Sequence, residues 1–206
     1  MKRIVLLLGF GIVCIGAVSF AAPRFVAARQ TADRNAAYAQ MMTKNGPLVL
    51  DGATQAVLAH ADRVETFRLV NPNADSDETA MPIGSSPPGM FVGGCQVLHI
   101  GPAKGPAFAA ALQAALSKMP SPGSPAGQTV PGPNDFGSDV CFRVWRGKAH
   151  ADIYASFNTG RGEIISQDAQ HKTLTQTVGV MGGSGPALLA LSKDAFPQDS
   201  YFADVK

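Results

Sequence analysis

The chain has 206 residues and a formal net charge of +2. Lys2 and Arg3 account for that excess, so the remainder is neutral and lacks the basic bias of a nucleic-acid-binding protein; we expect no nucleic-acid partner. The length suits one domain with a real core, while 22 glycines and 15 prolines predict long irregular loops.

An apolar run, Ile4–Ala22, follows Lys2 and Arg3 directly. A charged segment followed by an apolar run is typical of an export signal. The run is also long enough to span a bilayer, and Arg24 and Arg29 follow closely, which disfavours export of the run itself. Residues 1–22 are therefore predicted to be a cleaved signal peptide or a retained membrane anchor. Both place the rest in the periplasm, either free or anchored to the inner membrane and facing the periplasm.

Residues 23–47 are predicted to form a juxtamembrane helical segment, which ends at Asn45-Gly46-Pro47. Residues 48–206 are expected to form a single domain, in which 48–61 fits either a strand or a helix. Residues 63–70 alternate as a strand does, with Phe67 and Leu69 on one face and Thr66 and Arg68 on the other. A loop over 71–89 follows.

The middle of the domain combines one strand and one helix. Residues 91–100 are predicted as a strand. Apolar residues then recur at helical spacing over 106–118, where Pro106 suits the first turn and Pro120 ends the helix. Residues 120–137 are rich in proline, glycine and serine and lack periodicity, so we expect a second long loop there.

The C-terminal part is predicted to be a meander of strands over 140–145, 149–157, 163–167 and, more weakly, 172–180. Ser184-Gly185-Pro186 then precedes a final helix over 187–196, with Ser184 as its N-cap. The predicted fold class is therefore α+β, with a largely antiparallel sheet, about two packed helices, and an N-terminal hydrophobic signal or anchor helix.

Two cysteines lie beyond the apolar run, Cys95 and Cys141, both on predicted strands. In an oxidising compartment the simplest expectation is one disulfide between them, and two separately buried thiols are the alternative. Neither cysteine has another Cys or a His at metal-ligand spacing, so we expect no metal site. No phosphate-binding glycine loop is complete either, and we expect no cofactor.

A polar strand face supplies the candidate binding residues. His150, Asp152 and Tyr154 alternate along one predicted strand, and Arg143 and Trp145 lie on the strand before it. The plainer interpretation of such a face is a solvated sheet surface. The sequence has no G-x-S-x-G motif, and the serine in the glycine-rich loop at 182–186 is more simply a helix cap.

The stretch 141–157 resembles a group of uncharacterised exported bacterial proteins, in which a C-F-x-P-x-H-G strand is followed by a D-φ-φ-φ-C-F-x-C strand. Cys141-Phe142 and Gly147 match the first motif, and Asp152-Ile153 and Phe157 match the second. The cysteines of the second motif are Ser156 and Thr159 in this chain, so that thiol pair is not carried over. The resemblance implies export and this fold, and it supplies no activity.

Export, neutral charge, long loops and the lack of an assembled catalytic set together favour a non-catalytic binding domain. Its partner would be an unknown envelope protein or a small ligand, with possible membrane association through Ile4–Ala22. The alternative is an exported hydrolase whose site lies on the His150/Asp152 sheet face. A third interpretation is a purely structural envelope protein.

Overall fold

The structure, a computed structural model, describes residues 46–70, 89–121 and 137–205, together with Gln40, Lys44, Gly132, Pro133 and Asp135. The chain divides into two compact units, Met1–Gln40 and Met41–Lys206, and the elements below belong to the second. The predicted signal or anchor, nearly all of the juxtamembrane segment, residues 71–88 of the loop predicted over 71–89 and most of the loop over 120–137 lie outside the described residues. No described helix is long and apolar enough to cross a membrane.

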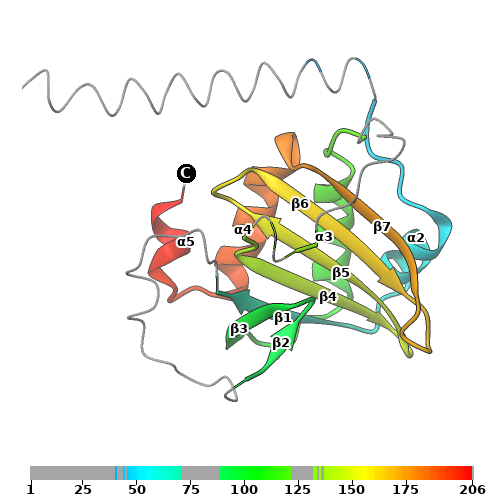
Figure 1. The fold of residues 1–206 in the computed structure, drawn as a ribbon, viewed down its shortest axis with the longest axis horizontal. Coiled ribbons are helices and arrows are strands. Elements are labelled where there is room, and N and C mark those ends of the chain that lie inside the picture. Colours follow the sequence, from blue (N-terminus) through cyan, green and yellow to red (C-terminus); the bar gives the residue numbers. More distant parts are fainter. Residues whose placement is uncertain are drawn as a thin grey trace, which may run out of the picture. The chain divides into compact units, whose positions relative to one another are not determined.

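A seven-stranded sheet forms the centre of this unit, in the order β2-β3-β1-β4-β5-β6-β7 (Figure 1). Every neighbouring pair is antiparallel, which confirms the predicted sheet type. The strands are β1 (Arg63–Leu69), β2 (Phe91–Val92), β3 (Cys95–Ile100), β4 (Val140–Arg146), β5 (Ala149–Ser156), β6 (Arg161–Gln167) and β7 (Thr173–Val180).

The described residues form four α-helices where about two were expected. They are α2 (Gly52–Ala59), α3 (Pro106–Leu116), α4 (Gly185–Ala195) and α5 (Ser200–Asp204), and a 3-10 turn, η2 (Gly182–Ser184), precedes α4. The segment at 48–61, which fitted either a strand or a helix, contains the helix α2, and the Asp51 carboxylate caps this helix by accepting from the Ala53 and Thr54 amides. The five residues of α5 are too few to show a helical period in the sequence.

The single strand expected over 91–100 is a hairpin of β2 and β3 instead. Gly93 and Gly94 both have positive φ angles, +56° and +81°, and they turn the chain between the two strands. Ser184 does precede α4, but its hydroxyl donates to the Met181 carbonyl and makes no capping hydrogen bond.

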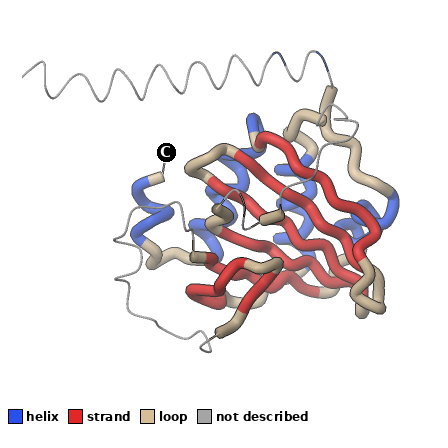
Figure 2. Tube along the Cα trace, viewed as in Figure 1, coloured by secondary structure: helices blue, strands red, loops and turns tan. Residues whose placement is uncertain are grey.

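One face of the sheet carries the main hydrophobic core, because α2, α3 and α4 pack against it (Figures 1 and 2). Alternate residues of β4 and β5, among them Phe142, Val144 and Ile153, point into this core and are at most 1% exposed. Each such side chain contributes about 1.5–3 kcal/mol through its burial. The candidate binding residues of β4 and β5 lie on the other face.

The second face carries a smaller cluster, which contains Phe67, Leu69, Val92, Cys95, Val97, Cys141 and Tyr154. The β2–β3 hairpin lies against this face, since the backbone of Gly93 approaches the Tyr154 hydroxyl so closely that a Cβ at position 93 would overlap it. Phe67 and Leu69 belong to this cluster, while Thr66 and Arg68 point to the opposite face, which confirms the predicted alternation in β1.

Candidate functional site

The structure brings the five candidate binding residues together on the second face. Arg143 pairs across the strands with Asp152, and Trp145 pairs with His150. Tyr154 lies next along β5, opposite Cys141. The side-chain face they share is not solvated, because His150, Asp152 and Tyr154 are 2%, 3% and 1% exposed. The solvated-surface interpretation is therefore wrong.

Asp152 is held by internal contacts. Its Oδ1 accepts from Arg143 Nε at 2.7 Å and its Oδ2 from Arg143 Nη2 at 2.8 Å, and Oδ2 also accepts from the Tyr154 hydroxyl at 3.2 Å. Burial lowers the pKa of Arg143, but the hydrogen bonds to Asp152 and its charge raise that pKa by more, so the guanidinium stays charged. Both carboxylate oxygens are thus occupied by the protein itself.

His150 lies beside this pair without joining it. Its Nε2 is 3.8 Å from Asp152 Oδ1, its ring centroid is 4.6 Å from that of Trp145, and the ring of His171 is 5.7 Å away. Burial lowers the pKa of His150, which keeps the imidazole neutral. Within the described part of the chain, His150 Nδ1 and Trp145 Nε1 are buried without a hydrogen-bond partner. An imidazole enclosed in this way is poorly placed to exchange protons with a substrate.

Both cysteines are free and buried, as the alternative of two separate thiols expects. Cys95 begins β3 and Cys141 lies in β4, with β1 between the two strands in the order of the sheet. No bond joins Cys95 and Cys141 in this structure, and a disulfide between them under oxidising conditions stays a prediction. Burial raises the pKa of Cys95 to about 11 and that of Cys141 well above its ordinary value.

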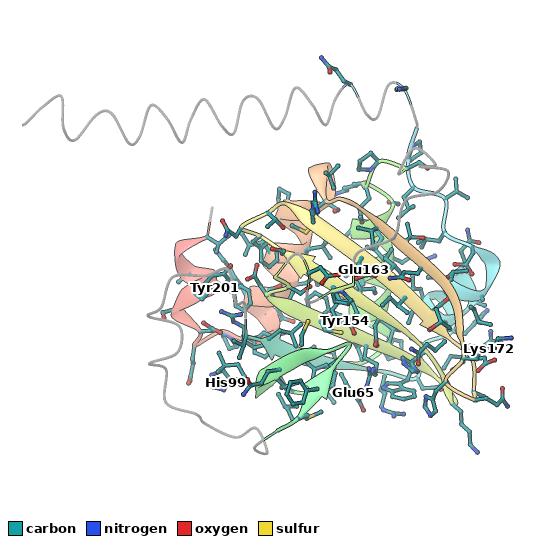
Figure 3. The ribbon with its side chains drawn as sticks, in the orientation of Figure 1. Glu65, His99, Tyr154, Glu163, Lys172 and Tyr201 are labelled. Atoms are coloured by element: carbon teal, nitrogen blue, oxygen red, sulfur yellow. The ribbon has the colours of Figure 1, made fainter. Side chains whose placement is uncertain are left out.

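Glu163 is a functional candidate that the sequence analysis missed. It lies in β6 opposite Tyr154, on the same face of the sheet, and is fully buried (Figure 3). Its Oε1 accepts from Gln176 Nε2, while its Oε2 has no hydrogen-bond partner among the described residues. Burial raises the pKa of Glu163 to about 7, and the nearby charge of Asp135 adds to this rise.

A Glu163→Gln variant should be more stable than the wild type above neutral pH. The pKa of Glu163 is about 7 in the folded protein and 4.5 when unperturbed, so its favourable contribution is complete below pH 4.5 and is lost as the pH rises through 7. We expect the variant to gain about 3 kcal/mol of unfolding free energy at pH 8.5 and almost nothing at pH 4.5. Urea denaturation at both pH values measures this, and an equal difference at the two would contradict it.

A pocket of about 250 Å³ opens where β1 meets β3. It is lined by Glu65, Phe67, Met90, Ile100, Gly101 and Ala103. The guanidinium of Arg143 lies 5.8 Å from the ring of Phe67, so the pocket adjoins the Arg143–Asp152 pair. Its lining comes from β1 and from both sides of the β2–β3 hairpin, and no single stretch of sequence marks it.

Glu65 is the one charged group that lines this pocket. Its side chain is 34% exposed, and it meets the exposed Arg63 only at 3.4 Å. Such an exposed ion pair contributes little, so the carboxylate can take another partner. The described residues contain no group of three or more His, Cys, Asp or Glu side chains placed to hold a metal ion.

Comparison of the chain with protein-family models, with curated proteins and with solved structures finds no match. The suspected relationship to exported proteins with the two strand motifs stays a prediction.

Proposed function

We propose that this chain is an exported, non-catalytic binding domain of the bacterial envelope, and that its ligand binds in the pocket between β1 and β3. The observation that carries the proposal is the contrast between two neighbouring sites. Both carboxylate oxygens of Asp152 accept hydrogen bonds from Arg143. The neighbouring pocket, in contrast, has apolar walls and the partly exposed carboxylate of Glu65. Arg143 and Trp145, both half-buried, lie in β4 beside β1, where Arg143 pairs with Glu65 across the two strands.

The lining of the pocket defines the chemistry of the ligand. Phe67, Met90 and Ile100 supply apolar surface, and Glu65 supplies negative charge. A pocket for a drug-sized molecule has about 300–1,000 Å³, so this one suits a smaller group. The group that fits best has a short apolar body and a positive end, that is, an alkylammonium.

The contacts of the polar face give the hydrolase alternative no support. A general base on this strand would be His150, whose imidazole is buried and neutral. The buried thiols of Cys95 and Cys141 have raised pKa values, so they stay protonated and are weak nucleophiles. Asp152 cannot orient His150 by a direct hydrogen bond at 3.8 Å.

Calorimetric titration of the full-length protein with n-butylammonium tests the proposal. We expect weak, saturable binding with a Kd in the millimolar range, as suits a ligand of about five heavy atoms. Replacing Glu65 with Gln should weaken this binding about five-fold, the effect of losing one partly exposed charge pair of about 1 kcal/mol.

Two controls make the titration specific to the pocket. Asp194→Asn removes an exposed carboxylate that does not line the pocket and should leave the Kd unchanged. The neutral probe n-butanol should bind the wild type and Glu65→Gln equally. Equal affinity of both proteins for n-butylammonium, or no saturable binding at all, would overturn the proposal.

A further inference from the structure

The β2–β3 hairpin covers the centre of the second face and also forms part of the pocket. Its turn residue Gly93 lies in contact with the Tyr154 side chain. The Val97 amide donates to the Met90 carbonyl at 2.9 Å, and this hydrogen bond closes the hairpin. Met90 is a wall of the pocket and packs against the cluster that contains Phe67. Any movement of the hairpin therefore changes the pocket.

Beneath this cover, Glu163 is surrounded by groups that cannot compensate a negative charge. The titratable groups that face it among the described residues are Tyr154 from β5, Cys95 from β3 and Asp135 from the segment before β4. Each of these three side chains becomes negative when it ionises, so none of them can neutralise the charge of Glu163. Gln176 from β7 donates one hydrogen bond to Glu163, and no described cation lies against it.

We propose that the β2–β3 hairpin is a pH-sensitive cover of this face, which stays packed while Glu163 is protonated and loosens when Glu163 ionises. This inference rests on the proposed function, because the hairpin would regulate access to the proposed binding pocket, which Met90 helps to form. Loosening widens the pocket on the hairpin side and admits water to the carboxylate.

The physical reason is the penalty of a buried charge. An ionised carboxylate without a cation or a full set of hydrogen bonds is strongly destabilised in an apolar environment. Glu163 has one unpartnered oxygen, and Asp135 repels it. The strands β5 and β7 are each fixed to β6 by seven residue pairs, whereas β2 pairs with β3 through two residue pairs and β3 pairs with β1 through three. The hairpin is the element that can yield at the lowest cost.

Amide hydrogen exchange in the full-length protein tests this inference. Opening would return the pKa of Glu163 from about 7 to its ordinary 4.5. The protection factor of the Val97 amide, corrected for the intrinsic pH dependence of exchange, should then fall about 30-fold between pH 5.5 and pH 8.5. The Glu163→Gln variant should keep the same protection factor at both pH values.

The control variant is Asp194→Asn, which removes an exposed carboxylate that does not line the pocket and should show the same 30-fold fall as the wild type. Unchanged protection of Val97 in the wild type, or an equal fall in Glu163→Gln, would overturn the inference. Because exchange is measured without ligand, such a result leaves the binding titration unaffected, and a failed titration leaves the exchange result standing.

Discussion

Replacing Arg68 with methionine should lower the unfolding free energy by about 3–5 kcal/mol, the effect of removing one member of a buried ion pair. Arg68 is fully buried, and its Nε donates to Asp199 Oδ2 at 3.1 Å. Its Nη1 donates to the carbonyls of Leu69 and Asp139 at 2.6 and 3.1 Å. Methionine fills much of the volume and satisfies none of these oxygens.

The same guanidinium attaches the C-terminal helix to the sheet. It lies 4.2 Å from the ring centroid of Tyr201 and 5.2 Å from that of Phe202, both in α5. Asp199 also caps α5, because its Oδ1 accepts from the Tyr201 amide. We therefore expect the Arg68→Met variant to loosen α5 as well as to unfold at lower urea concentration.

Urea denaturation with a matched control measures the effect. Arg63→Met makes the same substitution on the same strand, at a side chain that is 48% exposed, and should change the unfolding free energy by less than about 1 kcal/mol. If Arg68→Met were as mild as Arg63→Met, the buried ion pair would not hold α5 to the sheet.

The second large effect is expected at Arg143. Replacing it with methionine leaves the carboxylate of Asp152, 3% exposed, with the Tyr154 hydroxyl as its remaining hydrogen-bond donor among the described residues. We expect a loss of about 3 kcal/mol, at the lower end of the range for buried pairs because the Arg143 side chain is 22% exposed.

A double-mutant cycle with Asp152→Asn isolates the pair. Once the negative charge is gone, Arg143→Met should destabilise much less, so the coupling energy should be about 1–3 kcal/mol. Strictly additive effects of the two substitutions in urea denaturation would contradict an interaction between these side chains.

The sequence predicted which residues share a face, because the period of a strand is short and regular. It placed Phe67 and Leu69 together, and it placed His150, Asp152 and Tyr154 together. It did not predict that the second group is buried. For Tyr154 the burial depends on the β2–β3 hairpin lying over it, a contact between segments about 60 residues apart that no local period encodes.

Glu163 and the pocket escaped prediction for related reasons. A glutamate that alternates with apolar residues in a strand is ordinarily solvated, and only the cover above it makes Glu163 unusual. The pocket needs Met90 and Ile100 on either side of a turn whose two glycines looked like part of one strand. The sequence also did not predict that β1 lies between the strands of Cys95 and Cys141, and the disulfide expected between them stays a prediction.

The most direct test of the account is a map of where a cationic probe binds. Amide chemical shifts of the isotope-labelled full-length protein should be followed by NMR during titration with n-butylammonium. We expect the largest saturable changes in chemical shift at the amides that line the pocket, those of Glu65, Phe67, Ile100 and Ala103. In the Glu65→Gln variant these changes should be strongly reduced. Largest changes at Trp145 and His150 with the pocket amides unmoved, or no saturable change anywhere, would contradict this expectation.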